Sequence, residues 1–242
     1  MSDSLDGKRA LVTGASKGIG LAVAEALARE GVEVAICARK DAELRRALQV
    51  LKETAPQTKT TGCVADVSKA ADVSALFAFV DRELGGVDIL VNNAGLGIFR
   101  PAAELTIEEW DTMIGTNLSG AFYCSQSALT RFRHTGGGFI INISSLAGKN
   151  PFAGGSGYNA SKFGMNGFSE AMMLDHRNDN VRVSYIMPGS VDTEFSGQDS
   201  QERSDWKISP GDIAEIVLNI LKMPSRTLIS RVEVRPSRPR KN

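Results

Sequence analysis

The stretch "LVTGASKGIG", residues 11–20, joins a short apolar run to a segment of helical period and indicates the architecture of the chain. Its glycines, Gly14, Gly18 and Gly20, stand where a backbone must turn sharply, approach a ligand closely and pack a helix against a strand. The N-terminus of the following helix offers free N–H groups and a partial positive charge, which suit a pyrophosphate. The spacing matches neither G-x-G-x-x-G nor a Walker A sequence, and a glycine-rich turn alone is weak evidence. Its place between a strand and an amphipathic helix predicts a dinucleotide site.

Short apolar runs alternate with longer stretches of helical period along the whole chain. The runs expected to be strands are residues 9–13, 33–37, 60–65, 87–92, 138–144, 181–186 and 230–234. Several are apolar on both faces, as in a parallel sheet that helices cover on each side. Strict alternation of strand and helix gives right-handed crossovers. The pattern predicts an α/β fold: a doubly wound, Rossmann-type sheet of about seven mostly parallel strands.

We find no linker that would divide the chain, and therefore expect a single domain over residues 1–242. The polar segment "SGQDSQERSDWKIS", residues 196–209, has no clear periodicity. We expect a substrate loop or lid over about residues 190–209.

The charge balance, the apolar runs and the cysteine and histidine positions argue against several classes of protein. Lysine and arginine number 28, as do aspartate and glutamate, which argues against nucleic acid or an anionic membrane as the main partner. No apolar run approaches the ~20 residues that span a bilayer, and residues 1–10 do not resemble a secretory signal. Cys37, Cys63 and Cys124 form no C-x-x-C pair, and His134 and His176 have no nearby cysteine, so we expect no metal site. The expectation is a cytoplasmic globular protein.

The end of the second strand bears on cofactor choice. An acidic residue there would hold the ribose 2′-hydroxyl of NAD, but the strand runs into Arg39, whose guanidinium suits the 2′-phosphate of NADP. Lys17 in the glycine loop could reach the same phosphate. Asp41 is the rival acid, and it is interpreted as the N-cap of the next helix. Solvated surface charge is the plainer reading of both cations; their convergence favours NADP over NAD.

Several further motifs follow in order, and together they resemble the short-chain dehydrogenase/reductase family over nearly the whole chain. "TGASKGIG" is similar to its cofactor loop, "NNAG" (92–95) to its turn after the fourth strand, and "YNASK" (158–162) to its Y-x-x-x-K catalytic helix. "TNLSG", "INISSLAG" and "MPGSVDT" fit the remaining positions. The resemblance implies catalytic roles for Asn117, Ser145, Tyr158 and Lys162. It implies a cofactor site made of Gly14, Ser16, Lys17, Gly18, Ile19, Gly20, Arg39, Asp66, Val67, Asn93, Ala94, Gly95, Tyr158, Lys162, Pro188, Gly189, Val191 and Thr193.

The chemistry of carbonyl reduction explains the tyrosine–lysine pair. Hydride transfer builds negative charge on the carbonyl oxygen, and a tyrosine hydroxyl can supply the proton. An unperturbed tyrosine has a pKa near ~10, and lowering it by about 3 units requires roughly 4 kcal/mol of phenolate stabilisation. Lys162 lies one helical turn from Tyr158, so its ammonium, with the charge of the oxidised nicotinamide, is expected to lower that pKa. A core tyrosine beside a surface lysine is the plainer alternative for the pair taken alone.

Two hydroxyls compete for the role of holding the substrate oxygen. Ser144 and Ser145 end the fifth strand, and neighbouring strand side chains face opposite ways, so only one can point into the site. The family spacing selects Ser145. The resemblance also implies that the backbone carbonyl of Asn117 holds a water linking Lys162 to solvent, and that Asp66 contacts the adenine; a turn or cap role for Asp66 remains open.

The sequence therefore predicts an NADP-dependent oxidoreductase that interconverts a ketone or aldehyde and an alcohol. A 3-oxoacyl-[acyl-carrier-protein] reductase is the alternative within the family, and it would use exposed arginines such as Arg131, Arg133 or Arg177 to hold an acidic carrier. A non-catalytic NADP-sensing or scaffold protein is the alternative from another class, although such a protein would be expected to lose the tyrosine, lysine or serine.

The sequence also suggests a substrate pocket and a subunit interface. We expect a small-molecule substrate in a partly apolar pocket, with candidate lining residues Leu96, Phe99, Leu146, Phe152, Phe195 and Trp206. Family members are usually homotetramers or homodimers joined through two long helices, here about residues 107–133 and 157–177. Phe122, Met165, Phe168 and Met172 are candidates for that interface or for the core.

Overall fold

The computed structural model describes residues 4–193, 195 and 205–238. Strands and helices alternate along it. The strands are β1 (Arg9–Thr13), β2 (Glu33–Ala38), β3 (Thr60–Val64), β4 (Ile89–Asn92), β5 (Gly138–Ile143), β6 (Val181–Pro188) and β7 (Arg231–Val234). The α-helices are α1 (Gly18–Arg29), α2 (Asp41–Thr54), α3 (Ala70–Leu84), α4 (Ile107–Ile114), α5 (Gly120–Thr135), α6 (Ser156–His176) and α7 (Pro210–Leu221). A π-helical segment, η1 (Gly115–Ser119), joins α4 to α5, and short 3-10 turns are η2 (Leu146–Gly148) and η3 (Arg177–Asp179).

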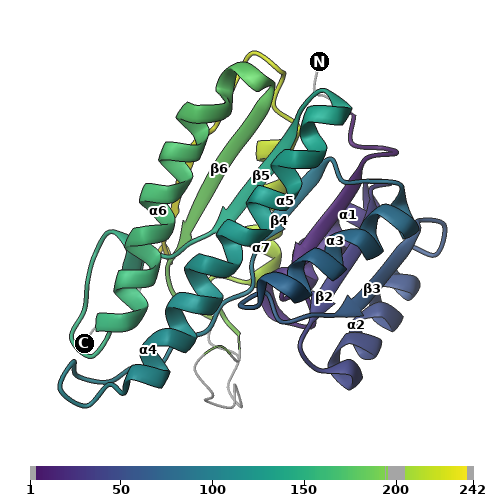
Figure 1. Cartoon of the computed structure of the whole chain (residues 1–242). Helices are drawn as coiled ribbons and strands as arrows, with labels where there is room; N and C mark the ends of the chain where they lie inside the picture. The colour runs from purple at the N-terminus through teal and green to yellow at the C-terminus, as the bar shows by residue number, and fades with distance from the viewer. Residues whose placement is uncertain (1–3, 194, 196–204, 239–242) are drawn as a thin grey trace.

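One parallel sheet carries all of these strands in the order β3-β2-β1-β4-β5-β6-β7 (Figure 1). The chain leaves β1 for β2 on one side and later returns to add β4 on the other. Leu11 in β1 accordingly pairs with Ala35 in β2 and with Leu90 in β4. A reversal of strand order opens a crevice at the carboxyl ends of the strands, where ligands bind in open α/β sheets. The predicted doubly wound fold is confirmed.

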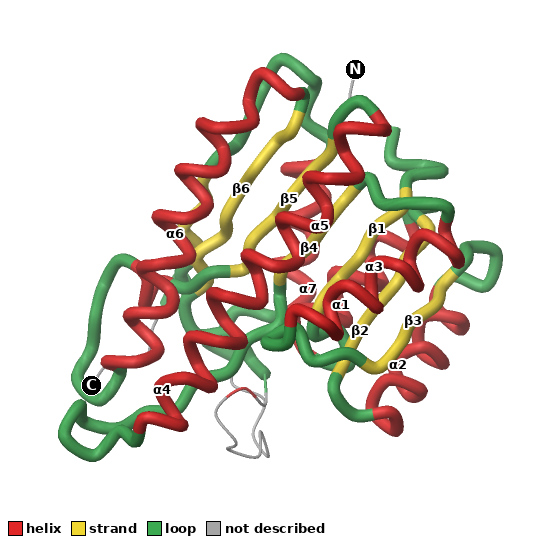
Figure 2. The backbone as a smooth tube through the Cα atoms, in the orientation of Figure 1, coloured by secondary structure: helices red, strands yellow, loops and turns green. Residues whose placement is uncertain are grey.

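Alternate residues of the inner strands serve two separate cores. Ala10 and Val12 face one core with residues of α1, α2 and α7, whereas Leu11 faces the other with residues of α3, α5 and α6. The tube in Figure 2 shows these helices covering the two faces of the sheet. Because the inner strands bury both of their faces, apolar residues occupy both faces of strands such as β1 and β2, as their sequences indicated.

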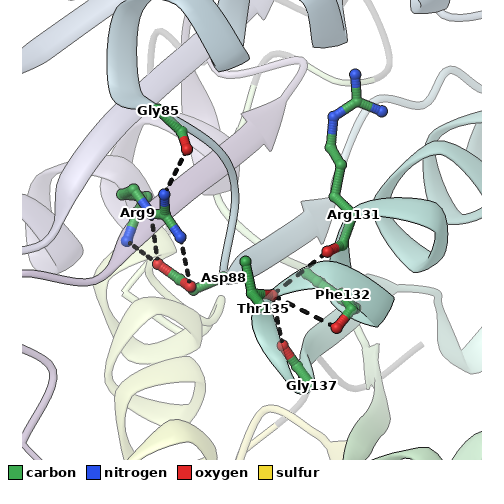
Figure 3. A network of polar contacts seen from close by, with 7 residues as sticks. All are labelled: Arg9, Gly85, Asp88, Arg131, Phe132, Thr135 and Gly137. Atoms are coloured by element: carbon green, nitrogen blue, oxygen red, sulfur yellow. Dashed lines mark hydrogen bonds and ion pairs between the residues drawn. The ribbon is translucent and has the colours of Figure 1, made fainter.

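The amino ends of β1 and β4 are joined by a charged pair far from those carboxyl ends (Figure 3). Arg9 donates from Nε to Asp88 Oδ2 at 2.8 Å, from Nη2 to Asp88 Oδ1 at 2.9 Å, and from Nη1 to the Gly85 carbonyl at 2.6 Å. Burial opposes ionisation of Asp88, but the hydrogen bonds from Arg9 outweigh it and lower the pKa of that carboxyl. The same view shows Thr135 donating to carbonyls of the last turn of α5.

Two local predictions need correction. The helix expected over residues 107–133 is interrupted by η1, which contains Asn117. Asp41 is the first residue of α2 and not its N-cap. Lys40 holds the N-cap position and its side chain does not cap the helix, while Asp41 pairs with Arg45 at 2.8 Å. The helix dipole stabilises a carboxylate in the first turn, so Asp41 still has a structural role.

The residues predicted for a subunit interface or for the core differ in their burial. Met165 and Met172 are buried, whereas Phe122 is 42% exposed and meets Phe168 edge-on at 6.0 Å. Of the predicted lid, residues 194 and 196–204 lie outside the described residues. Its described ends are paired, since the Asp192 N–H donates to the Ile208 carbonyl at 2.9 Å.

Two further observations concern the described residues alone. None of their helices combines the length and the apolar character that crossing a bilayer requires. No group of three or more histidine, cysteine, aspartate or glutamate side chains among residues 4–193, 195 and 205–238 is placed to hold a metal ion.

Candidate active site

A cavity of about 910 Å³ opens at the carboxyl ends of the strands. Among the residues predicted for the catalytic and cofactor sites, Gly20 and Asn117 do not line it, and all the others do. The six candidate substrate residues line the same cavity. Segments separated by more than 200 residues in sequence, from the glycine loop to Arg235, thus meet in one place.

The glycine loop is held against the turn after β4. Gly14 has a φ of +62°, and a Cβ there would lie 2.6 Å from Ala94 Cα, so a side chain is excluded on both counts. A Cβ on Gly20 would lie 2.4 Å from Asn93 Nδ2. That amide donates to the carbonyls of Thr13 at 3.0 Å and Gly14 at 2.9 Å. These contacts lock two cavity walls together, so Gly20 shapes the site without lining it.

Lys17, Gly18 and Ile19, at the N-terminus of α1, line this cavity. The N-cap is Lys17, with no side-chain cap bond, and the first turn contains no acid. By contrast, α4 and α7 begin with reciprocal capping boxes, Thr106 with Glu109 and Ser209 with Asp212. No side-chain cap and no first-turn acid at α1 therefore competes with an anionic ligand for this helix N-terminus.

Charged side chains gather where the glycine loop meets the end of β2. Arg39, Lys17 and Lys40 line this part of the cavity, and so does Glu43, which sequence reasoning missed. Glu43 Oε1 accepts from Lys40 Nζ at 3.0 Å, and this bond lowers the pKa of the carboxyl. Helical periodicity placed Glu43 in the first turn of α2, but only the fold shows that this turn faces the glycine loop.

Asp66 lies across the same region and organises a turn. Its Oδ1 accepts from the Ser68 N–H at 3.1 Å and from Ser68 Oγ at 2.7 Å, and its own N–H donates to Asp72 at 3.0 Å. The turn role left open for Asp66 is therefore present. Asp66 also lines the cavity, so adenine contact stays a prediction.

Tyr158 and Lys162 project from the first turns of α6, four residues apart, and both line the cavity while being 8% and 4% exposed. Lys162 Nζ donates to the Ile143 carbonyl at 2.9 Å and lies 5.8 Å from the centroid of the Tyr158 ring. Burial lowers the pKa of Lys162 to about 8. Burial also raises the pKa of Tyr158, and the hydrogen bond with Ser145 only partly offsets this. The sequence predicted a lowered pKa for Tyr158, whereas burial of the phenol raises it.

The structure separates the two competing serines. Ser145 lies close enough to the Tyr158 phenol to oppose the rise in its pKa, and its Oγ accepts from the Ala147 N–H at 3.1 Å at the start of η2. Ser144 also lines the cavity, but its hydroxyl is hydrogen-bonded to Asn166, whose amide donates to the Gly148 carbonyl at 3.0 Å. The hydroxyl selected by motif spacing is the one beside the phenol.

Asn117 is fully buried behind the cavity wall. Its side chain accepts from the Leu96 N–H at 2.9 Å, donates to the Leu96 carbonyl at 2.8 Å and donates to Ser161 Oγ at 3.0 Å. Ser161 in turn donates to the Tyr158 carbonyl at 2.7 Å. The π-helical segment thus couples the loop after β4 to the helix that carries Tyr158. A water relay at the Asn117 carbonyl stays a prediction.

Comparison with known proteins agrees with this geometry. The short chain dehydrogenase family matches residues 8–204. The chain belongs to the short-chain dehydrogenase family. A sepiapterin reductase from Chlorobaculum tepidum is 35% identical over 94% of this chain and 95% of its own length. This family member also superimposes on an alcohol dehydrogenase from Thermococcus sibiricus, complexed with 5-hydroxy-NADP, with a TM-score of 0.89, 32% identity and coverage of 97% and 99% of the two chains. Actinorhodin polyketide ketoreductase with NADPH gives a TM-score of 0.86, with 32% identity and 98% of each chain covered.

Proposed function

We propose that this short-chain dehydrogenase is an NADP-dependent oxidoreductase that interconverts a ketone or aldehyde and an alcohol, with Tyr158 as the acid/base. One observation carries the proposal: Tyr158, Ser145 and Lys162 line the same cavity as the glycine loop, with Lys162 one helical turn from Tyr158. A phenol, a hydroxyl and an ammonium converging on one cleft form an acid/base site.

The protonation state of Tyr158 favours reduction. Because burial raises its pKa, the phenol is protonated at neutral pH and ready to donate to a carbonyl oxygen as negative charge develops there. Ser145 can hold the same oxygen by a hydrogen bond, which fixes it within reach of Tyr158. Lys162 supplies positive charge below about pH 8, and its three donors suit sugar hydroxyls.

The residues at the other end of the cavity fit NADP. The uncapped N-terminus of α1 suits a pyrophosphate, and Lys17 with Arg39 suits a 2′-phosphate. The NADP, hydroxy-NADP and NADPH named with solved family members support the same choice. Bound NADPH supplies the hydride that the carbonyl carbon accepts. Replacing Arg39 by aspartate is expected to shift preference toward NAD, and tighter NAD binding by the wild type would contradict the choice.

Carrier-bound 3-oxoacyl substrates are a second candidate, which the similarity to a polyketide ketoreductase favours. The arginines proposed to hold the carrier do not support it. Arg131 donates to Asp81 at 2.8 Å and stacks 4.9 Å from the Phe77 centroid, and neither Arg133 nor Arg177 lines the cavity. Acetoacetyl thioesters assayed beside free ketones separate the two functions.

Loss of NADPH absorbance on adding a panel of ketones and aldehydes tests the proposal directly. We expect turnover of at least one carbonyl compound, and slower turnover with NADH. A protein that binds NADPH but oxidises it with no carbonyl compound would instead support the sensing or scaffold role.

A further inference from the structure

Three phenylalanine rings surround the reacting end of the cavity. The Phe99 centroid lies 5.6 Å from that of Tyr158 in an edge-to-face arrangement and 5.6 Å from that of Phe152. The Phe195 centroid lies 5.7 Å from Tyr158 on a tilted plane. These rings are 45%, 47% and 41% exposed for Phe99, Phe152 and Phe195, although all three line the cavity. Apolar rings left open beside a proton donor are available to a ligand.

The loops that carry Phe99 and Phe152 are joined to each other. A β-bridge joins Arg100, directly after Phe99, to Gly155, three residues after Phe152. In the amide orientation that satisfies both neighbours, buried Asn159 accepts from the Phe152 N–H and donates to the Gly155 carbonyl, each at 2.9 Å. The Phe152 loop is therefore fixed to α6, the helix that carries Tyr158.

Two glycines make room for the rings. A Cβ on Gly97 would lie 2.7 Å from Phe99 Cζ and 2.9 Å from Phe195 Cε1. A Cβ on Gly155 would lie 2.6 Å from Phe152 Cε2. All three distances are shorter than real Cβ contacts, so a side chain at either position would push a ring away. The ring cluster depends on glycine at both places.

We propose that Phe99, Phe152 and Phe195 form an aromatic subsite, which makes the substrate a carbonyl compound whose reacting carbon is attached to a planar ring. The inference rests on the proposed function and adds the substrate class. Ring pairs favour edge-to-face and offset-stacked arrangements at centroid distances of about 4.5–7 Å, and open phenyl faces provide such positions for a further ring. A rigid ring also loses less rotational freedom on binding than an alkyl chain of equal carbon number.

The test compares two methyl ketones of equal carbon number, 1-phenylethanone and 2-octanone, in NADPH oxidation. We expect kcat/KM to favour the aryl ketone by about tenfold or more. Phe99→Leu should reduce that preference by roughly tenfold while 2-octanone is still turned over, and Gly97→Ala should act in the same direction. Phe122→Leu is the matched control, because Phe122 is 42% exposed on α5 and does not line the cavity; its preference should equal that of the wild type.

The outcomes separate this inference from the proposed function. Equal turnover of the two ketones, or an unchanged preference in Phe99→Leu, overturns the aromatic subsite and leaves the oxidoreductase assignment standing. No oxidation of NADPH with any carbonyl compound overturns both. Calorimetric titration of 1-phenylethanone into the NADP-bound protein gives a second readout: binding should weaken in Phe99→Leu and not in Phe122→Leu, and equal binding by the two variants overturns the subsite.

Discussion

Replacing Lys162 by methionine should change how the stability of the cofactor-free protein depends on pH. Lys162 is 4% exposed, its ammonium makes one hydrogen bond to the Ile143 carbonyl, and burial lowers its pKa from 10.5 to about 8. Methionine has a similar length and volume without the charge, so packing should be largely preserved. Loss of the bond to Ile143 adds a cost that does not vary with pH.

The magnitude follows from linkage. A pKa difference of this size corresponds to about 3 kcal/mol of destabilisation where the lysine is charged in both the folded and unfolded states. Between the two pKa values the unfolded chain binds more protons than the folded one, so the contribution of Lys162 to stability rises with pH. It is lowest below about pH 8 and fully recovered above pH 10.5. From pH 7 to pH 10 the expected gain is about 2–3 kcal/mol.

Buried thiols make the stability of the protein fall as the pH rises, so the effect of Lys162 has to be measured as a difference between wild type and variant. Burial raises the pKa of Cys37 to about 12 and also raises the pKa values of Cys63 and Cys124. Unfolded thiols ionise near their model value of 9.0, so these three groups lower stability as the pH rises above it. They are present in both proteins, and the difference between wild type and Lys162→Met cancels them.

Urea unfolding at a series of pH values from 7 to 10 measures that difference. The free energy of unfolding of the variant minus that of the wild type should fall by about 2–3 kcal/mol across the series. A difference that stays constant would show that Lys162 titrates alike in the folded and unfolded chains, and it would refute the buried-ammonium reasoning.

Three further changes probe other parts of the account. Glu43→Gln should tighten NADP binding roughly two- to threefold, because it removes a carboxylate that pairs with Lys40 at the end of the cavity where Arg39 lies. Calorimetry at low and high salt measures the affinity, and an unchanged affinity would place the 2′-phosphate elsewhere. Ser145→Ala should lower kcat on the order of 100-fold with little change in KM, measured by steady-state kinetics, and near-normal kcat would remove Ser145 from the reaction. Asp88→Asn should lower the free energy of unfolding by about 1–2 kcal/mol at pH 7, because the ionised Asp88 carboxylate, whose pKa is lowered, stabilises the fold. Turnover should not change, since the Arg9–Asp88 pair lies at the far end of the sheet. Equal urea midpoints would contradict the expected loss of stability.

The parts of the site that were predictable from sequence depend on short-range geometry. Gly14 and Gly18 both adopt positive φ in a strand–turn–helix, which glycine spacing can indicate. Tyr158 and Lys162 share a helical face because they are four residues apart. Strand runs apolar on both faces indicated a parallel sheet, whose carboxyl ends collect the loops.

The parts that escaped prediction depend on contacts between distant segments. The π-helical interruption at Asn117 accompanies side-chain bonds to Leu96, 21 positions away. Cys37 and Cys63 seemed widely spaced, yet they are register partners on β2 and β3. The raised pKa of Tyr158 comes from burial, which no motif reports. These features required the folded chain.

Comparison of Tyr158→Phe with the wild type tests the central proposal most directly. The variant keeps the ring and its packing while removing the hydroxyl that we propose as the proton donor to the carbonyl oxygen. NADPH titration should give a dissociation constant within about threefold of the wild type, while kcat with the best carbonyl substrate should fall by at least about 1,000-fold. Turnover near the wild-type rate in a variant that binds NADPH normally would show that the proton comes from another group.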